Sequence, residues 1–381
     1  MPFDLKMFGN NLQRYRLQLQ LEIEEVSKKT GISRDRLAQL ENGLSEPSGD
    51  EVLIFADFYK QNYNYFISNQ QKTASEQVDI LYRKYGAEFS KADRWALQEF
   101  LFICECEEFV FKSLNLEGLH FIYQPQGNYY KAHGEEAAIA LRKSMGLKDD
   151  NIITNPYQTL RKLGVHIFRR KLNNSNISGL FINHPIAGKC VLVNYNEDIY
   201  RQNFTLAHEI GHAIFDYQDE INVSYENSAW TNRDLKEIRA NTFASNFLIP
   251  KSIFNSFHVT KWNQTLILSL AKQLQVNIEP LLIAMKNAGA ISAQEQDSFK
   301  QIKLSKVDKL DPELKGLSDR YYSTKLSLLE RGISDFYIKN CFETYSRGFI
   351  SSGRLSEMLL CNEKELSALL KNFNLQLSYD N

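Results

Sequence analysis

The spacing of apolar positions near the N-terminus predicts a group of short helices, because apolar residues recur there every three or four positions. We expect helices over 8–20, Ile23–Thr30, Arg34–Glu41 and Glu51–Tyr59. Gly31 favours the left-handed conformation that ends a helix, and Ser33 is placed to cap the next one. The fourth helix is expected to turn four side chains inward: Val52, Leu53, Phe55 and Ala56. A helix, a tight turn and a capped helix form a helix-turn-helix layout.

The central part of the chain mixes helical and strand-like patterns. Residues 69–78 are polar and predict a connector, and the pattern from Asp79 to about Leu116 is helical and rich in aromatic residues. Further helices are expected at Gly134–Met145 and Pro156–Leu163, and strands at 165–170, 179–183 and 189–194. A short turn joins the last two strands, which indicates a hairpin. This part therefore predicts a small antiparallel sheet that precedes the next helix, and after Pro250 the pattern is almost entirely helical.

The segment Phe204–Tyr217 carries two histidines four residues apart. On a helix, His208 and His212 lie one turn apart on the same face, so both imidazoles can bind one cation. Glu209 is rotated by about 100° from His208, which keeps it from being a ligand but lets it reach a water held by the metal. This is the logic of the His-Glu-x-x-His motif, in which the glutamate is a general base. A zinc ion needs a third protein ligand and keeps its fourth position for water.

A second helix supplies a candidate for the third ligand. Residues 235–248 have an apolar helical face that ends before Pro250, and Glu237 lies on this helix. Packed antiparallel to the histidine helix, it would complete a set of two histidines and one glutamate. Asn241 follows one turn later and is expected to hydrogen-bond a ligand imidazole. Gly211 has no side chain and would let another segment approach closely.

The competing interpretation is a helix that happens to contain two histidines, because the four-residue motif also occurs by chance. The candidate third ligand and the apolar neighbours favour zinc. The remaining histidines lack this spacing and are expected to be structural or exposed, and His184 in the hairpin is the candidate for an additional contact at the site.

Composition indicates an ordinary globular protein. Of 381 residues, 43% are apolar and 24% are charged, which is enough to bury a core. The net charge of −1 argues against nucleic-acid binding by bulk charge, though not against a local basic face. The five scattered cysteines predict neither a disulfide framework nor paired zinc ligands, and Cys104 and Cys106 are expected in the core. Because neither a secretory signal nor a run of eighteen apolar residues is visible, we expect a cytoplasmic protein without a membrane partner.

The central residues resemble the ImmA/IrrE family of zinc metallopeptidases. The resemblance covers about residues 131–290 and rests on three stretches in order, "SGLFINHPIAGKCVLVN", "NFTLAHEIGHAIF" and "EIRANTFASNFLIP". Arg201 stands where the family commonly has a basic residue, and Arg239 where it often has a second glutamate, whereas Glu237 is retained. The resemblance implies a zincin-like α+β core of the gluzincin type, Zn²⁺ as cofactor, and cleavage of repressor proteins.

Residues 8–66 resemble a helix-turn-helix domain of the Xre/Cro type, with "TGISRDRLAQLENGLSEPS" at its centre. Ile23 stands where this family usually has glutamine, and Ser27 where it has alanine. The resulting division is a helix-turn-helix domain at 1–68, a helical connector at 69–130, a metallopeptidase domain at 131–290 and a helical C-terminal region at 291–381. The fold class is therefore mainly α, with a small α+β core and helical regions at both ends.

The charge of the N-terminal region leaves two interpretations open. The first 70 residues hold eight Lys and Arg against ten Asp and Glu, which weakens non-specific binding to phosphates. Basic residues nevertheless gather around the turn. We expect Arg34, Arg36 and Gln39 to reach base edges, and Lys28 and Ser33 to contact phosphates. The alternative is a protein-interaction module on the same scaffold.

The leading functional hypothesis is a zinc metalloendopeptidase that regulates transcription, a stress response or a mobile element by cleaving a repressor. His208, His212 and Glu237 would bind the zinc, and Glu209 would act as general base. One alternative is a non-catalytic Xre-type transcriptional regulator, in which the metallopeptidase fold senses a signal or dimerises. Another is a repressor whose own cleavage relieves repression. A homodimer stays open, and the sequence assigns no chemistry to 291–381.

Overall fold

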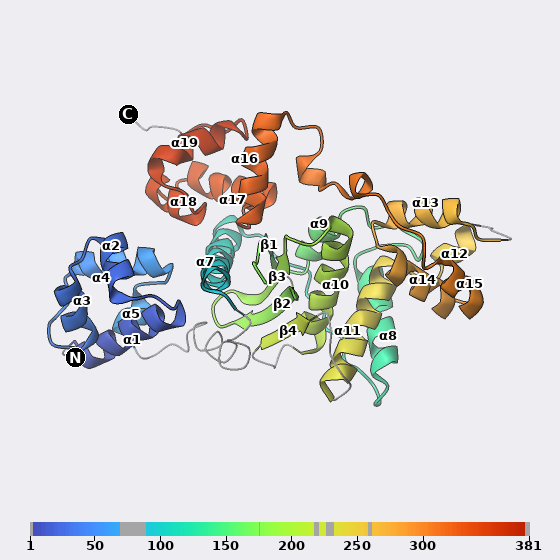
Figure 1. Cartoon of the computed structure of the whole chain (residues 1–381), viewed down its shortest axis with the longest axis horizontal. Coiled ribbons are helices and arrows are strands. Elements are labelled where there is room, and N and C mark those ends of the chain that lie inside the picture. Colours follow the sequence, from blue (N-terminus) through green and yellow to red (C-terminus); the bar gives the residue numbers. More distant parts are fainter. Residues whose placement is uncertain are drawn as a thin grey trace.

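The computed structural model describes residues 3–68, 89–174, 176–216, 221–225, 232–257 and 261–377. Most of these residues are helical, and four strands form one small sheet (Figure 1). The predicted fold class, mainly α with a small α+β core and helical regions at both ends, is confirmed. The predicted connector at 69–78 and the expected helix start at Asp79 lie outside the described residues.

The N-terminal helices pack around an aromatic core. They are α1 (Leu5–Gln18), α2 (Ile23–Thr30), α3 (Arg34–Glu41), α4 (Gly49–Tyr59) and α5 (Asn64–Ile67). Gly31 adopts a φ of +76° at the end of α2, and the Ser33 hydroxyl accepts a hydrogen bond from the backbone N–H of Arg36. Both predicted boundaries of the turn are therefore confirmed.

Two expectations for α4 are wrong. The helix begins at Gly49 rather than at Glu51, because the side chains of Ser48 and Glu51 each accept a hydrogen bond from the other's backbone N–H. Leu53 is 59% exposed instead of facing inward, whereas Phe55 is fully buried. Two positions along a helix correspond to about 200° of rotation, so these side chains lie on opposite faces.

The sheet has the strand order β1-β3-β2-β4. Its strands are β1 (His166–Arg170), β2 (Ile177–His184), β3 (Gly188–Asn194) and β4 (Ile221–Tyr225). The predicted hairpin of β2 and β3 is antiparallel, but β1 pairs in parallel with β3, and β4 joins the other edge only after the histidine helix. The sheet is therefore mixed rather than purely antiparallel.

The buried side chain of Asn194 stabilises this topology. Its Oδ1 accepts a hydrogen bond from the backbone N–H of Leu172, and its Nδ2 donates to the carbonyl of Ile177. These bonds hold the chain that follows β1 against the end of β3. The C-terminal ends of β1 and β3 therefore lie side by side, as they do in a parallel pair.

Helices cover both faces of the sheet (Figure 1). The histidine helix α10 (Ile199–Phe215) lies on one face, with α8 (Tyr130–Ser144), α9 (Pro156–Arg161) and α11 (Asn232–Leu248) around it. The long helix α7 (Lys91–Leu114) lies on the other face. Side chains alternate along β3 accordingly: Val191 and Val193 belong to the first core, and Cys190 and Leu192 to the second.

The C-terminal part of the described chain is helical, as predicted. Two groups of helices are joined by a segment with two short 3₁₀ helices, η2 (Lys306–Lys309) and η3 (Pro312–Leu314). The first group is α12 (Ile253–Ser256), α13 (Gln264–Leu274), α14 (Ile278–Asn287) and α15 (Ala293–Phe299). The second is α16 (Asp319–Glu330), α17 (Asp335–Ser346), α18 (Ser352–Met358) and α19 (Glu363–Lys371). This second group shares the core formed by α7 and the sheet.

A similar turn between two α-helices occurs at five places in the described chain. In each case a residue with positive φ stands two positions before the residue at the N-cap position of the second helix. The pairs are Gln20 and Glu22, Gly31 and Ser33, Gln275 and Asn277, Gly332 and Ser334, and Leu360 and Asn362. Four positions after each N-cap residue an apolar side chain is buried: Val26, Leu37, Leu281, Ile338 and Leu366. Glycine takes the positive-φ position in two of these turns, at Gly31 and Gly332.

The helix-turn-helix domain is docked on α7. Arg94 donates a hydrogen bond to the carbonyl of Gln18, and Gln98 donates to the carbonyl of Lys60. The rings of Phe58 and Trp95 meet edge to face at 5.6 Å between centroids. Because α7 also packs on the sheet, it connects the helix-turn-helix unit to the sheet whose other face carries α10.

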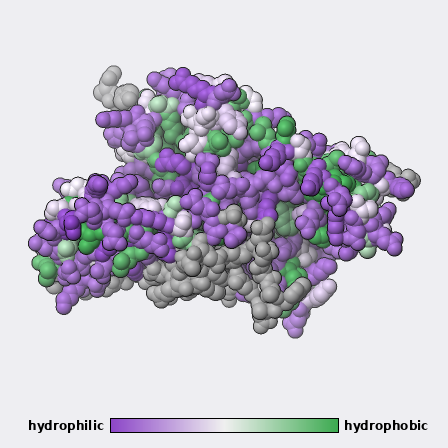
Figure 2. All heavy atoms as spheres, viewed as in Figure 1, coloured by the Kyte–Doolittle hydropathy of each residue, from purple (hydrophilic) through white to green (hydrophobic). Residues whose placement is uncertain are grey.

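The face of the molecule seen in Figure 2 is mostly hydrophilic, and its hydrophobic side chains gather only in small areas. Among the described residues no single helix is long and apolar enough to span a membrane, although α13 and α14, bent by 104°, would together meet those criteria. Cys104 and Cys106 are buried in the core, as expected.

Candidate metal centre

The histidine helix α10 is capped and almost completely buried. The Asp198 side chain accepts hydrogen bonds from the backbone N–H groups of Tyr200 and Arg201, which fixes the start of the helix. His208 is 6% exposed and His212 is 1% exposed, so both rings are held within the core of the domain.

Three ligand-type atoms converge at this point. The Nε2 atoms of His208 and His212 lie 3.1 Å apart, and the carboxylate of Glu237 on α11 reaches both rings. Its oxygens lie 3.1 Å from Nε2 of His208 and 3.6 Å from Nε2 of His212. In the part of the chain that the structure describes, this is the one group of three His, Cys, Asp or Glu side chains close enough to share an ion.

The other nitrogen of each ring has a hydrogen-bond acceptor beside it. Nδ1 of His208 lies 3.0 Å from Oδ1 of Asn241, the residue expected to orient a ligand imidazole. Nδ1 of His212 lies 2.8 Å from Oδ2 of Asp216. Because an oxygen accepts, each ring donates its Nδ1–H, which leaves Nε2 as the atom that faces Glu237 and can bind a metal.

Sequence reasoning missed Asp216. Its spacing gave a signal, since it lies four residues after His212 and therefore one turn further along the same face. Arg239, which stands where the resembled family often has a glutamate, donates to the second oxygen of Asp216 at 2.5 Å. The guanidinium also lies over the ring of Phe215, 4.3 Å from its centroid. Arg239 therefore braces the carboxylate that orients His212.

The charges of the site depend on one another. Burial alone would lower the pKa of His212, but hydrogen bonds with Asp216 and Glu237 outweigh it and raise that pKa to about 10. Burial tends to raise the pKa of Glu237, yet the contacts with both histidines hold it well below its usual range. Burial opposes the ionisation of Asp216 as well, and His212 and Arg239 keep its pKa low. A cation between the rings would take the place of the proton that His212 otherwise holds.

Glu209 is fully buried, and its carboxylate lies beside Gly179 of β2. A Cβ atom on Gly179 of β2 would lie 3.0 Å from Oε1 of Glu209 and 2.7 Å from Cγ2 of Thr205. Glycine at this position therefore gives the carboxylate room beside the strand. Glu209 also contributes to the raised pKa of His212, which places its charge near the metal site without making it a ligand.

Close packing of helices positions Glu237. A Cβ atom on Gly211 of α10 would come within 3.1 Å of Cα of Ala240 on α11, so the glycine permits the expected close approach. On the other side of α11, Gly134 of α8 is packed so tightly that a Cβ atom there would lie 2.9 Å from the backbone nitrogen of Phe243. Both glycines thus bring α11, and with it Glu237, up to the histidines.

His184 does not take part in the site. Its Nδ1 accepts hydrogen bonds from the backbone N–H groups of Ile186 and Ala187, and its Nε2 lies 3.3 Å from Glu105 of α7. The ring stabilises the hairpin turn and connects it to α7. The expectation of an additional contact at the site is therefore wrong.

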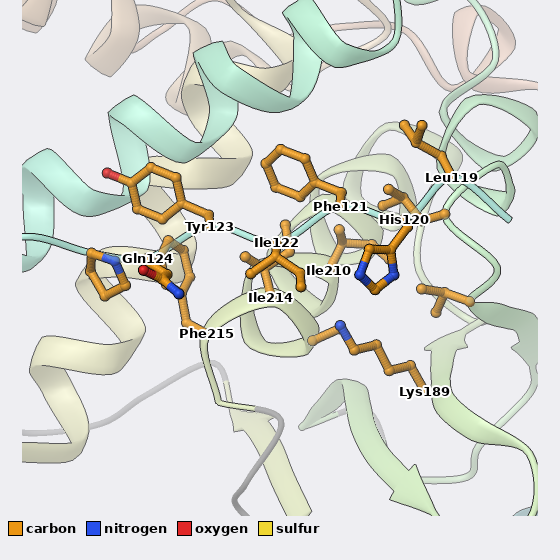
Figure 3. A pocket seen from close by; sticks show the side chains of 14 residues that line it. Leu119, His120, Phe121, Ile122, Tyr123, Gln124, Lys189, Ile210, Ile214 and Phe215 are labelled. Atoms are coloured by element: carbon orange, nitrogen blue, oxygen red, sulfur yellow. The ribbon is translucent and has the colours of Figure 1, made fainter.

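A separate cavity of about 630 Å³ lies on a different side of α10 (Figure 3). It is lined by Ile210 and Ile214 of α10, by the extended segment 119–125 and by Lys189 of β3. Each isoleucine follows a histidine by two positions, which corresponds to about 200° around the helix. This cavity is therefore not part of the metal centre.

The predicted DNA-contact residues separate into two groups. Lys28, Ser33, Arg34 and Gln39 are exposed around the turn and α3, and Arg34 pairs with Glu24 at 3.0 Å. Arg36 instead donates to both oxygens of Glu51 at 2.7 Å, to Ser45 and to the carbonyl of Glu46. These bonds hold its guanidinium within the domain, so the expectation that Arg36 reaches a base edge needs revision.

Comparison with known families agrees with this arrangement. Residues 160–286 match the family model described as the IrrE N-terminal-like domain, and residues 12–66 match a helix-turn-helix family model. No curated protein matches the chain. These two matches give the chain a metallopeptidase-family domain and a helix-turn-helix domain. More particularly, the chain contains an IrrE/ImmA-like domain after an N-terminal helix-turn-helix, the architecture that the resemblance predicted.

Proposed function

We propose that the protein is a zinc-dependent endopeptidase. The observation that carries the proposal is the convergence of His208, His212 and Glu237, with the second nitrogen of each ring held by an acceptor. Two imidazole nitrogens and one carboxylate form a ligand set that zinc uses in catalytic sites, where the fourth position is open to water or substrate.

Zinc in such a site supplies Lewis acidity toward water and toward a peptide carbonyl. Glu209 lies on the same helix, close enough to affect the pKa of His212, and has no part in the ligand set. It would take the proton from the attacking water and return it to the leaving amine. Asn241 and Asp216 would hold the histidine rings in the orientation that this chemistry requires.

The helix-turn-helix domain supports a regulatory setting for this activity. We propose that the substrate is a protein, a repressor in particular, and that the exposed residues around α3 bind DNA. Lys28, Ser33, Arg34 and Gln39 are the contact residues of this proposal. A cytoplasmic location agrees with five cysteines that form no disulfide, four of which are buried.

The test is the substitution Glu209→Gln. The variant should bind zinc as the wild type does and lose proteolysis of candidate repressors, and a chelator should abolish proteolysis by the wild type. Glu117→Gln, a change at an exposed residue outside the site, serves as the matched control and should cleave normally. Proteolysis by the Glu209→Gln variant would end the assignment of the general base.

A non-catalytic regulator is the second candidate function. The observation that favours it is the docking of the helix-turn-helix domain on α7, which shares a core with the sheet beside α10. In that case zinc would change DNA affinity while no protein is cut. Zinc-dependent DNA binding together with the absence of any cleavage by the wild type would favour this candidate over the peptidase.

A further inference from the structure

A groove of about 810 Å³ runs along α11 away from the metal centre. Its floor is one stripe of α11, and its walls come from the start of α8 and from α14, which lie beside α11 (Figure 1). The floor residues recur at helical spacing: Ile238, Asn241, Thr242, Ser245 and Ile249. The exposed side of α14 contributes Glu279, Pro280, Ile283 and Asn287.

Three residues of the groove lie next to the predicted zinc ligands in space or in sequence. Asn241 lines the groove and also contacts His208 through its Oδ1 at 3.0 Å. Phe204 lines the groove one turn before His208 on α10, and Ile238 directly follows Glu237. A chain lying in the groove would therefore pass beside Asn241, which holds the ring of His208.

The chemistry of the lining suits an extended polypeptide. Apolar side chains stand at intervals along the groove, among them Phe204, Ile238 and Ile283, which is 43% exposed. Between them the floor carries the hydroxyl of Thr242 and the amide of Asn246, which donate to carbonyls of α11. Their oxygens can still accept hydrogen bonds from peptide N–H groups. An amphipathic helix would instead need a continuous apolar floor. The mixed lining therefore favours a strand-like segment over a helix.

The length of the groove fixes how much chain it can hold. From Ile238 to Ile249 the floor spans about 17 Å at 1.5 Å per helical residue. An extended chain rises about 3.3 Å per residue, so the groove accommodates about five residues.

We propose that this groove binds an extended segment of the substrate protein, about five residues to one side of the cleaved bond, with apolar side chains at some of those positions. The inference rests on the proposed peptidase function and adds the substrate class and the docking surface. Lys251, paired with Glu135 at the far end, marks where the bound segment leaves the groove.

Peptide binding can be tested without catalysis. A phage-displayed library of random twelve-residue peptides is selected on the zinc-loaded full chain carrying Glu209→Gln. Selected peptides should lose at least about tenfold in affinity when Ser245→Arg fills the floor or Ile283→Asp charges the wall. Because these residues come from different helices, a folding defect in one variant leaves the other informative. Circular dichroism checks the fold of both.

Matched controls place the same changes elsewhere. Ser323→Arg alters an exposed residue of α16, and Ile122→Asp alters the exposed isoleucine of the separate cavity in Figure 3. Both should leave peptide affinity unchanged. Failure to select any peptide, or equal binding by the blocked variants, would overturn the groove as a docking surface.

Hydrolysis of the selected peptides by the zinc-loaded wild type separates the two proposals. If the wild type cuts the peptides and the groove variants cut them less, both proposals are supported. If the peptides bind in a groove-dependent way but are not cut, the peptidase function is overturned and the peptide-binding site stands. If the peptides are cut equally well by Ser245→Arg and Ile283→Asp, the peptidase function stands and the groove is overturned as a docking surface.

Discussion

His212 and Asp216 form a hydrogen-bonded pair one helical turn apart, with Nδ1 of the histidine 2.8 Å from Oδ2 of the aspartate. The other oxygen of Asp216 accepts from Arg239 on α11. The pair fixes both the tautomer and the orientation of the ring, so that Nε2 faces Glu237. The helix that carries Glu237 thus also supplies the group that braces the carboxylate.

This relationship predicts a loss of zinc affinity on changing Asp216. Asp216→Ala should weaken zinc binding by about 10- to 100-fold, the usual effect of losing a partner that orients a ligand. Asp216→Asn keeps an acceptor oxygen and should lose less. Competition with a chromophoric chelator measures both affinities. Asp150→Ala, at an exposed position, should bind zinc normally, and an unchanged affinity in Asp216→Ala would contradict the role of the pair.

The packing of α8 on α11 predicts that Gly134→Ala is harmful. Replacing a glycine within a helix by alanine usually raises the free energy of unfolding by about 0.5–1 kcal/mol. Here the new Cβ atom would lie 2.9 Å from the backbone nitrogen of Phe243, which cannot move without shifting α11. We expect a loss of about 1–3 kcal/mol in the free energy of unfolding, with weaker zinc binding, measured by urea unfolding and chelator competition.

Gly49→Ala is the matched control for this change. Gly49 lies at the start of α4, and a Cβ atom there would meet nothing within 4 Å. The control should be neutral or stabilising and should bind zinc normally. If Gly134→Ala behaves in the same way, α8 does not constrain the position of Glu237.

The two arginines of α3 should respond differently to substitution. Arg34→Ala should lower the affinity for a selected DNA duplex by about 1–3 kcal/mol, because this side chain is exposed beside the turn. Arg36→Ala should instead destabilise the domain, because it removes the partner of Glu51. Fluorescence anisotropy measures DNA binding, and thermal unfolding of the same samples measures stability. Equal DNA affinity in the wild type and Arg34→Ala would favour a protein-interaction module.

The contacts of His166 predict that the free energy of unfolding depends on pH. The ring is fully buried, with Nδ1 2.8 Å from Glu107 and Nε2 3.2 Å from Glu108. Burial would lower the pKa of His166, but the two glutamates on α7 outweigh it and raise that pKa to about 10. This pKa lies above the value of about 6.5 in the unfolded chain. The stabilisation from the charged ring is therefore fully present below about pH 6.5 and is lost as the pH rises through about 10.

The substitution His166→Gln should remove this pH dependence. It leaves the buried carboxylate of Glu107 without its cation, so we expect a loss of about 3–5 kcal/mol at pH 6 that shrinks toward pH 10. Urea unfolding followed by tryptophan fluorescence over this range measures the difference. His120→Gln, at an exposed histidine, should follow the wild type. If the difference in free energy of unfolding between the wild type and His166→Gln does not change with pH, the ring of His166 is not charged.

Local sequence signals were enough to place the N-terminal turn and the histidine helix. Gly31 and Ser33 act on their immediate neighbours through a left-handed backbone and a capping hydrogen bond. The four-residue spacing put His208 and His212 on one face for the same reason, since helical geometry relates only nearby residues. The apolar pattern of α11 likewise made Glu237 a candidate ligand.

Contacts between distant segments could not be derived in this way. Nothing local fixes the distance between Glu237 and the rings, which depends on how Gly211 and Gly134 let three helices pack. Arg36 is held by Glu51, fifteen residues later in the chain. The end of β1 is likewise held by Asn194 at the end of another strand. These outcomes, and the groove beside Asn241, follow from packing of side chains brought together by the whole fold, which the periodicity of one segment does not encode.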